Sequence, residues 1–322
     1  MLSFEKAAER WLEPLEQRMR EAFKDQGLLE EMASYHLETG GKRVRGLMPM
    51  WLVSNMGGAG RGALDVGAAF ELFHNATLVH DDLQDEDEVR RGKPTIWKRW
   101  GAPQAINLGD AMYFYAYDCL QSPGVPDGLA KIAGRAMAAV VGGQTLEFQM
   151  QLPASAPSAI APSLDAFFRM ARGKTGALFG ACMEGAAMCQ GVREPASFKA
   201  WGEQIGILFQ VQDDYLDLVG DKGRDRAGSD LAEGKISFPV AWTVSNADES
   251  VSKRLEEIVR APRRDTTNAM IDEGMSLLET GGGLEATRLY LLKESQSLSS
   301  LDVSGYLPGF VERILKPVAH AL

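Results

Sequence analysis

The chain has 322 residues, of which 45% are hydrophobic and 24% are charged, so it has the composition of a globular protein with a large buried core. Its formal net charge of −10 argues against nucleic acid or an anionic membrane surface as a general partner. Three cysteines without a CxxC pair, behind an N-terminus that lacks a secretory signal, indicate reduced thiols and a cytoplasmic protein.

Helical periodicity dominates the chain, and strand alternation is nearly absent. The predicted helices span residues 4–23, 46–56, 64–85, 104–120, 128–150, 164–190, 196–219, 251–260, 267–280, 284–299 and 307–319. The proline-rich stretch 153–162 is predicted to be a surface loop. No run approaches 18 uninterrupted apolar residues, so no integral membrane segment is expected. The sequence therefore predicts an all-α antiparallel helix bundle.

Two aspartate clusters of identical spacing lie in these helical runs. Their members are Asp81, Asp82 and Asp85 in the first, and Asp213, Asp214 and Asp217 in the second. In a helix, positions i, i+1 and i+4 project from neighbouring parts of one face, so we expect each cluster to gather its carboxylates in one patch. A solvated acidic face is the alternative for either cluster alone, but both clusters continue helices with the apolar pattern of buried elements.

Two like charges about 4 Å apart repel by about 4 kcal/mol at an effective dielectric near 20, so carboxylates from both clusters around one cavity would need a metal ion. Because no Cys accompanies them, and His74 and His80 have no further histidine beside them, oxygen-bound Mg²⁺ is favoured over zinc. A site shared by both clusters also predicts one domain over residues 1–322, built around a deep central cavity.

Basic residues flank both clusters. Lys42, Arg43 and Arg45 follow a Gly-Gly turn and form either an anion cradle or a solvated helix start. Arg90 and Arg91 can make bidentate contacts with phosphate, and Gly92-Lys93-Pro94 is predicted to end their helix. Cations beside a metal suit a ligand rich in phosphate, and an apolar helical cavity suits a hydrophobic tail. These features predict a diphosphate ester of a lipid as the substrate.

The chain resembles the trans-isoprenyl diphosphate synthases, the family that elongates prenyl chains. The matching segments follow the family's order and are 40–45, 71–85, 90–95, 109–110, 174–176, 209–217 and 228–235. The resemblance implies a homodimer that condenses isopentenyl diphosphate with an allylic prenyl diphosphate, head to tail, to an all-trans product. In this family Mg²⁺ and cations assist departure of the allylic diphosphate, and the alkene of isopentenyl diphosphate then attacks.

The resemblance also implies roles for individual residues. It assigns the metal to Asp81, Asp85 and Asp213 and supporting roles to Asp82, Asp214 and Asp217. The residues expected at the allylic substrate are Arg90, Lys174, Thr175, Gln210 and Lys235, and those expected at isopentenyl diphosphate are Lys42, Arg45, His74 and Arg91. The family usually has Gly-Lys where this chain has Asp225-Arg226, so Arg226 is a candidate for that lysine's phosphate contact, although the two cations are not equivalent.

Product length is predicted from the residues before the first cluster. In this family the tail grows toward the positions of Thr77 and Ala76, where makers of short chains often carry aromatic residues. Their small size favours a product of about twenty carbons, geranylgeranyl diphosphate, or longer. Phe73 and Tyr113 are further candidates for the floor of the cavity. Alternatively, the aromatic run 112–117 has a structural role in the hydrophobic core or at a subunit interface.

Three alternative functions remain. A farnesyl diphosphate synthase differs only in product length. A class I terpene cyclase would carry an Asn/Ser/Glu metal motif in place of the second cluster and would not need Lys42 and Arg45. A non-catalytic subunit of a heteromeric prenyl synthase would typically lose one cluster, whereas this chain keeps both.

Overall fold

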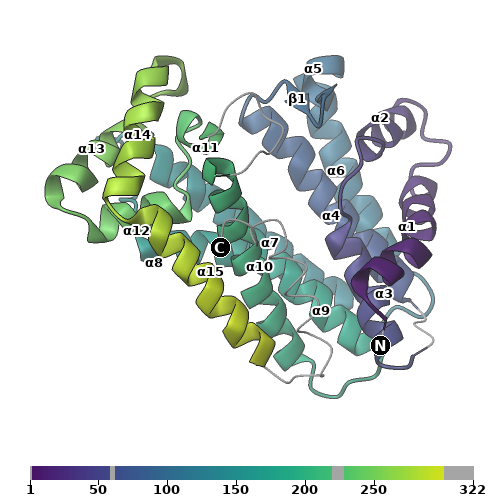
Figure 1. Ribbon diagram of the computed structural model, residues 1–322. Coiled ribbons are helices and arrows are strands. Elements are labelled where there is room, and N and C mark those ends of the chain that lie inside the picture. The colour runs from purple at the N-terminus through teal and green to yellow at the C-terminus, as the bar shows by residue number, and fades with distance from the viewer. Residues whose placement is uncertain (1, 59–61, 220–227, 301–322) are drawn as a thin grey trace. The chain divides into compact units, whose positions relative to one another are not determined.

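The computed structural model describes residues 2–58, 62–219 and 228–300, and helices dominate these residues (Figure 1). The predicted all-α class is therefore confirmed, with a single two-stranded hairpin in the described part of the chain. The chain divides into two compact units, Met1–Met137 with Leu178–Gly202, and Ala138–Ala177 with Glu203–Leu322. The long helices α7 (Leu129–Gln151) and α10 (Ala196–Val219) contribute residues to both units.

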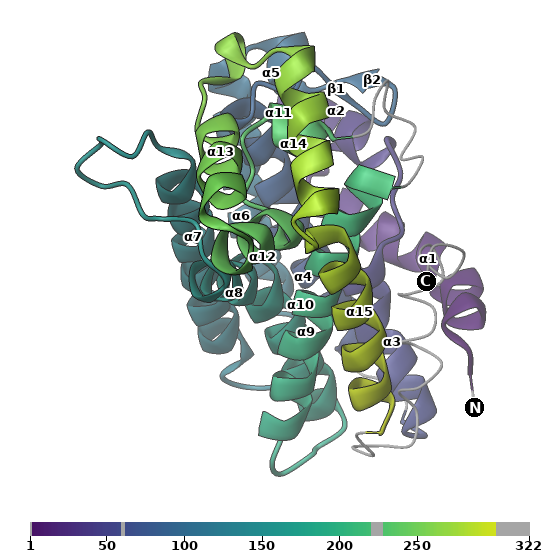
Figure 2. The ribbon, with the colours of Figure 1, turned by 60° about the vertical axis from the view of Figure 1, so that its left-hand side comes forward.

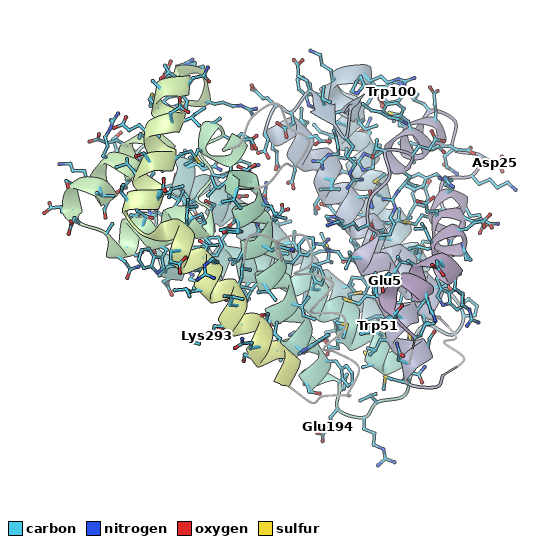
Figure 3. The ribbon with its side chains drawn as sticks, in the orientation of Figure 1. Glu5, Asp25, Trp51, Trp100, Glu194 and Lys293 are labelled. Atoms are coloured by element: carbon cyan, nitrogen blue, oxygen red, sulfur yellow. The ribbon has the colours of Figure 1, made fainter. Side chains whose placement is uncertain are left out.

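The first unit is built on α3, α4 and α6, with α4 packed against both of the others. Besides parts of α7 and α10, its elements are α1 (Phe4–Glu21), α2 (Leu28–Leu37), α3 (Val44–Asn55), α4 (Ala63–Gln84), β1 (Val89–Arg90), β2 (Lys93–Pro94), α5 (Ile96–Trp100), α6 (Ala102–Cys119) and most of α9 (Ala177–Cys189). The helix α1 packs on α3 and α4, and its Phe4 ring lies 6.1 Å from that of Trp51, which Figure 3 labels.

Close backbone contact joins α3 to α4. A side chain at Gly67 would place its Cβ 2.2 Å from the carbonyl oxygen of Gly46, so this crossing requires glycine. Apolar residues surround α4 along most of its length, as expected for a buried helix. The crossing holds the start of α3 beside the middle of α4, and α4 ends at the first aspartate cluster.

The second unit packs α12 against α8, α13 and α15. Its elements besides α7 and α10 are α8 (Leu164–Ala171), the π-helical turn η1 (Arg172–Gly176), α11 (Ser229–Ala232), α12 (Phe238–Asn246), α13 (Glu249–Val259), η2 (Arg263–Asp265), α14 (Asn268–Thr280) and α15 (Gly283–Ser300). An aromatic core fixes α8, α12 and α15, with ring centroids 5.6 Å apart for Phe167 and Phe238 and 4.8 Å apart for Phe238 and Tyr290.

Side-chain caps mark the starts of two helices. Ser3 and Ser163 accept hydrogen bonds from the first turns of α1 and α8. The stretch 153–162 contains no helix and projects as a loop between α7 and α8 (Figure 2), as predicted. In the described residues no helix is both long and apolar enough to cross a membrane.

The structure also corrects the predicted elements. Four α-helices were not predicted, namely α2, α5, α11 and α12, and the predicted helix 164–190 is interrupted by the π turn at Arg172–Gly176. The segment after the first cluster is a hairpin rather than the end of a helix. Its turn residues, Arg91 and Gly92, have φ values of 51° and 77°, the signature of a tight hairpin turn with two left-handed residues. The predicted helix 307–319 lies outside the described residues.

Candidate active site

The first aspartate cluster lies at the C-terminal end of α4. Asp81 and Asp82 belong to the last turn of the helix, and the backbone N–H of Asp85 donates to the carbonyl of Asp81 over 2.8 Å. Asp81 and Asp85 are partly exposed, whereas Asp82 is only 1% exposed. The three carboxylates are therefore not equivalent, because two are accessible to a ligand and one is buried.

Arg90 on the hairpin neutralises the buried carboxylate. Its Nε and Nη2 atoms lie 2.7 Å and 2.6 Å from Oδ1 of Asp82. Burial nevertheless raises the pKa of Asp82, with the Arg90 contact acting in the opposite direction. The second oxygen of Asp82 is buried and accepts no hydrogen bond from the residues that the structure describes. An orphaned carboxylate oxygen beside two accessible carboxylates is a hard donor set, which fits a divalent cation with oxygen ligands.

The Gly-Gly turn before α3 forms the seat of Arg91. Nη1 of Arg91 donates a hydrogen bond to the carbonyl oxygen of Gly40. A side chain at Gly41 would bring its Cβ within 2.8 Å of the same nitrogen, and Gly41 also has a φ of +140° that favours glycine. The glycines therefore allow the hairpin arginine to lie directly on the basic loop.

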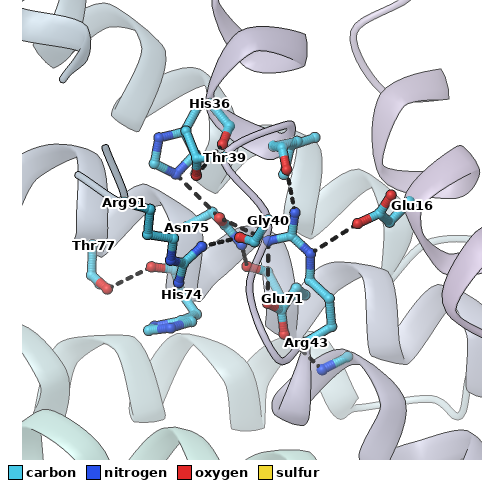
Figure 4. Close-up of polar contacts among 12 residues, drawn as sticks. Glu16, His36, Thr39, Gly40, Arg43, Glu71, His74, Asn75, Thr77 and Arg91 are labelled. Carbon is cyan, nitrogen blue, oxygen red and sulfur yellow. Dashed lines mark hydrogen bonds and ion pairs between the residues drawn. The ribbon is translucent and has the colours of Figure 1, made fainter. Parts of the chain in front are cut away.

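The three cations of this loop have different environments. Lys42 is exposed to solvent, and Arg43 is buried. Arg45 is 8% exposed and lies with its guanidinium carbon 4.4 Å from the centroid of the Phe179 ring. Figure 4 shows that Arg43 points toward Glu16 and Glu71. The three cations therefore do not form a single anion-binding group. Lys42 and Arg45 are the two loop residues predicted to bind diphosphate. Between them in the sequence lies Arg43, which is paired with buried or partly buried carboxylates instead.

The charges of four arginines act on His74 of α4. Burial, followed by the charges of Arg45, Arg90, Arg91 and Arg43, lowers the pKa of His74 well below its usual value. The imidazole is therefore neutral at physiological pH, and it lies in a strongly positive field. Three of the residues predicted to hold isopentenyl diphosphate, Arg45, His74 and Arg91, come together in one unit, and Lys42 belongs to the same loop. This arrangement suits an anion that carries several negative charges.

The second aspartate cluster lies on α10 in the other unit, and its carboxylates are also unequal. Asp213 is exposed, whereas Asp214 and Asp217 are 4% and 3% exposed. Asp214 accepts hydrogen bonds from Nε2 of Gln210 over 2.9 Å and from the backbone N–H of Phe238 over 2.8 Å. Burial, followed by the charge of Asp230, raises the pKa of Asp214 to about 8. Asp214 therefore joins α10 to the start of α12.

Asp217 caps a short helix rather than facing solvent. Its two carboxylate oxygens accept hydrogen bonds from Oγ of Ser229 over 2.5 Å and from the backbone N–H of Asp230 over 2.9 Å. Both donors belong to the first turn of α11. Asp213 alone is therefore exposed in this cluster, and its three carboxylates have different environments.

Two lysines predicted to bind the allylic substrate form ion pairs in the second unit. Lys174 on the π turn pairs with Glu147 of α7, which is 6% exposed. A side chain at Gly143 would lie 2.3 Å from the backbone nitrogen of Lys174, so glycine allows the π turn to approach α7. Nζ of Lys235 lies 2.5 Å from Oε2 of Glu233.

Thr175 and Gln210 extend the hydrogen-bonded chain from Asp214, since Oγ of Thr175 donates to Oε1 of Gln210 over 2.7 Å. Sequence reasoning did not identify Glu147, Glu233 or Glu71 as part of these networks. Glu147 and Glu71 could have been identified from the sequence, because each is a carboxylate within an apolar helical run. The aspartate clusters were identified by the same feature. The candidate Arg226 lies outside the described residues.

Two of the residues predicted to set product length, Phe73 and Tyr113, belong to an aromatic layer in the first unit. Ala76 is fully buried, and the hydroxyl of Thr77 donates to the carbonyl of His74. One turn deeper, the ring of Phe73 lies 6.4 Å from that of Tyr113 and 5.0 Å from that of Tyr117. Burial, followed by the charge of Asp81, raises the pKa of Tyr113 to about 12. The layer is therefore continuous from Phe73 to the vicinity of the first cluster.

Within the described residues, no preformed group of three or more His, Cys, Asp or Glu side chains is arranged to hold a metal ion. The predicted ligands are divided, with Asp81 and Asp85 in the first unit and Asp213 in the second.

Comparisons with known proteins agree on one family. Residues 26–278 match the family model of polyprenyl synthetase. The short chain isoprenyl diphosphate synthase of Methanothermobacter thermautotrophicus is 32% identical over 86% of this chain and 85% of its own. The geranylgeranyl diphosphate synthase of Mycobacterium tuberculosis is 31% identical over 79% of this chain and 76% of its own. A crystal structure of geranylgeranyl pyrophosphate synthase aligns with a TM-score of 0.85 and 26% identity, covering 98% of this chain and 99% of that one. The chain therefore belongs to the polyprenyl synthetase family and is a trans-isoprenyl diphosphate synthase, a prenyltransferase that elongates prenyl chains.

Proposed function

We propose that this enzyme condenses isopentenyl diphosphate with an allylic prenyl diphosphate and releases geranylgeranyl diphosphate as its main product. The observation that carries the proposal is the set of guanidinium groups around the neutral His74, beside the accessible carboxylates of Asp81 and Asp85. A group of cations next to accessible carboxylates can hold one diphosphate directly and a second one through a metal ion.

In the proposed enzyme the two units form one domain around a single central cavity, into which both aspartate clusters face. Asp81, Asp85 and Asp213 would hold Mg²⁺, because their oxygen donors suit a hard cation and their carboxylates are accessible. Bound there, Mg²⁺ would neutralise the allylic diphosphate and make it a better leaving group. Asp82, Asp214 and Asp217 would support this site through their contacts with Arg90, Phe238 and Ser229.

The cationic side chains bind and orient the two substrates. Lys42, Arg45 and Arg91 hold isopentenyl diphosphate, and His74 donates a hydrogen bond to it without a change of charge. The side chains at the allylic diphosphate are Arg90, Lys174, Thr175, Gln210, Arg226 and Lys235. They stabilise the negative charge that grows as the allylic carbon–oxygen bond breaks. The alkene then attacks that carbon, and a proton leaves to the departing diphosphate.

The side chains along α4 support a product of about twenty carbons. Ala76 and Thr77 do not obstruct the path of a growing tail, whereas Phe73, Tyr113 and Tyr117 form an aromatic layer one turn deeper. We propose that this layer stops elongation. The similarity to a geranylgeranyl diphosphate synthase over 79% of the chain supports the same length. A farnesyl product is the alternative.

We propose that the protein is a cytoplasmic homodimer. Phe114 is 75% exposed and Ile106 is 48% exposed, and the two residues lie two turns apart on one face of α6. Exposed apolar side chains in such a row are typical of a subunit interface. The three free thiols fit a reducing compartment. Light scattering should report a dimer for the wild type and a monomer for Phe114→Glu, and a wild-type monomer would contradict the proposal.

The function is tested with purified protein, Mg²⁺, isopentenyl diphosphate and each allylic primer in turn, followed by chain-length analysis of the products. The expected result is a linear all-trans product of about twenty carbons, formed only when the metal is present. A cyclic hydrocarbon would instead indicate a terpene cyclase. Activity that appears only with a second protein would indicate a non-catalytic subunit of a heteromeric synthase.

A further inference from the structure

A buried polar network lies behind the basic loop, where α2, the start of α3 and the middle of α4 meet (Figure 4). Its members are Glu16, His36, Arg43, Glu71 and Asn75, and we call it the Asn75 network. His36, Glu71 and Asn75 are each at most 3% exposed. None of these three was predicted to bind a substrate, and their burial prevents direct contact with one.

Arg43 connects this network to the basic loop. Its backbone has the left-handed conformation, with a φ of 46°, directly before α3. Its guanidinium donates to the carbonyl of Leu37 over 2.5 Å and to Oδ1 of Asn75 over 3.5 Å, and it lies within 3.3 Å and 3.8 Å of the carboxylates of Glu16 and Glu71. These contacts turn Arg43 inward. They hold a backbone conformation that is unfavourable for a residue with a side chain.

Glu71 holds the first turn of α3 from the neighbouring helix. Its Oε2 accepts a hydrogen bond from the backbone N–H of Gly46 over 2.8 Å. This N–H is one of the groups that a helix start leaves without a partner, and a carboxylate there also interacts favourably with the helix dipole. Glu71 thus fixes the turn that carries Arg45.

Asn75 orders the network through an unambiguous set of hydrogen bonds. Its Nδ2 donates to the carbonyl of Glu71 over 2.7 Å, so its Oδ1 must be the acceptor for the other two contacts. Nε2 of His36 lies 3.1 Å from this oxygen and is therefore the protonated nitrogen of a neutral ring. Asn75 directly follows His74 in α4, so the same amide joins α2, Arg43 and the helix that presents His74.

We propose that His36, Asn75 and Glu71 are positioning residues for isopentenyl diphosphate. They hold Arg43 in its inward position, and this position keeps the side chains of Lys42 and Arg45 apart. This inference rests on the proposed function of Lys42, Arg45 and His74. The Asn75 network holds the left-handed turn at Arg43, so that Lys42 stays on the exposed side of the loop while Arg45 stays on Phe179. It thereby sets the binding geometry for one of the two substrates only.

Steady-state kinetics with each substrate varied separately test the inference. His36→Leu removes the donor to Asn75 and should raise the KM for isopentenyl diphosphate about three- to tenfold, the loss expected for one or two hydrogen bonds. The KM for the allylic substrate should stay within about twofold of wild type. His36→Gln places an amide N–H near the former Nε2 and should restore most of the affinity. Equal changes in both KM values, or no difference between the two variants, would overturn the proposal.

Asn55→Ala is the matched control. Asn55 lies at the opposite end of α3 and also makes several hydrogen bonds, to Leu2 and to the carbonyl of Trp51. Its loss should lower the melting temperature without changing either KM. A rise in the KM for isopentenyl diphosphate in this control would show that general destabilisation explains the effect of His36→Leu.

Limited proteolysis provides a measurement that does not depend on the enzymatic reaction. Trypsin cleaves after lysine, and Lys42 is exposed in the loop that the network holds. His36→Leu should be cleaved after Lys42 several times faster than wild type and than Asn55→Ala. Faster cleavage in a protein without condensation activity would refute the proposed function, and with it the role in binding isopentenyl diphosphate, but would show that the network holds the loop. Unchanged cleavage in an active protein would refute the positioning role alone.

Discussion

Replacing His36 with glutamine is expected to make the folded protein less sensitive to acid. Burial, followed by the charges of Arg90 and Arg43, lowers the pKa of His36 from 6.5 to about 3. Below pH 6.5 the unfolded chain therefore binds a proton at this residue that the folded chain does not bind. The stability that neutral His36 confers is complete above its unfolded pKa and is lost as the pH falls toward about 3.

The size of the effect follows from this shift. One pKa unit corresponds to about 1.4 kcal/mol, and about pH 5 lies roughly one and a half units below the unfolded pKa. His36 alone should therefore reduce the free energy of unfolding by about 2 kcal/mol between pH 7.5 and pH 5. Glutamine keeps a donor for Asn75 but cannot be protonated, so His36→Gln should not lose this amount.

Urea unfolding of both proteins at the two pH values measures the difference directly. Carboxylates and His74 titrate alike in both proteins, so their contributions cancel when the two free energies are subtracted. The sequence contains four histidines, so the NMR resonance missing from His36→Gln identifies His36, and this resonance should not titrate in the wild type down to pH 5. Parallel stability curves for the two proteins, or a His36 ring that titrates near its ordinary pKa, would refute the reasoning.

Three further substitutions test other contacts. Gly109→Ala would place its Cβ 2.2 Å from Nε2 of His80 and should cost about 1–3 kcal/mol in urea unfolding. This cost should largely disappear when His80→Ala is added, and additive losses would contradict the contact. Arg90→Gln leaves the buried Asp82 without its counter-ion and should cost about 3–5 kcal/mol, with Asp82→Asn recovering much of it in the double variant. Ala76→Phe should shorten the product in the condensation assay, and an unchanged product distribution would show that elongation stops elsewhere.

The long helices could be predicted from the sequence because each carries a continuous apolar pattern. The prediction failed where the pattern was short or was set by distant contacts. The two-residue strands of the hairpin are too short to show an alternation of polar and apolar residues. The hairpin is defined instead by the left-handed turn conformation of Arg91 and Gly92. The π turn at Arg172–Gly176 follows from the close approach of Gly143 on α7, which the local sequence does not contain.

The residue types of the site could also be predicted, but not the direction in which each side chain points. Sequence spacing treats Lys42, Arg43 and Arg45 as one cationic group, yet Arg43 turns inward because Glu16, Glu71 and Asn75 come from other helices. A cation in a basic run acquires its role from the acceptors around it. Those acceptors lie up to 32 residues away in the chain, so their proximity depends on the tertiary fold.

The two aspartate clusters share a spacing but use it differently, and helix length explains the difference. The second aspartate of each cluster points inward, where Arg90 binds one oxygen of Asp82 and the backbone N–H of Phe238 donates to Asp214. At the last aspartate the clusters diverge, because α4 ends at Gln84 whereas α10 continues to Val219. Asp85 consequently lies beyond its helix and is partly exposed, while Asp217 remains within α10 and caps α11.

These contacts reduce the electrostatic repulsion within each cluster. Arg90 neutralises Asp82, hydrogen bonds satisfy Asp214 and Asp217, and the pKa of Asp214 is raised to about 8, so that this group is largely protonated at neutral pH. The accessible negative charge is then confined to Asp81, Asp85 and Asp213, the residues proposed to hold the metal. Each cluster therefore presents less negative charge than its three aspartates suggest, so fewer cations are needed to balance it.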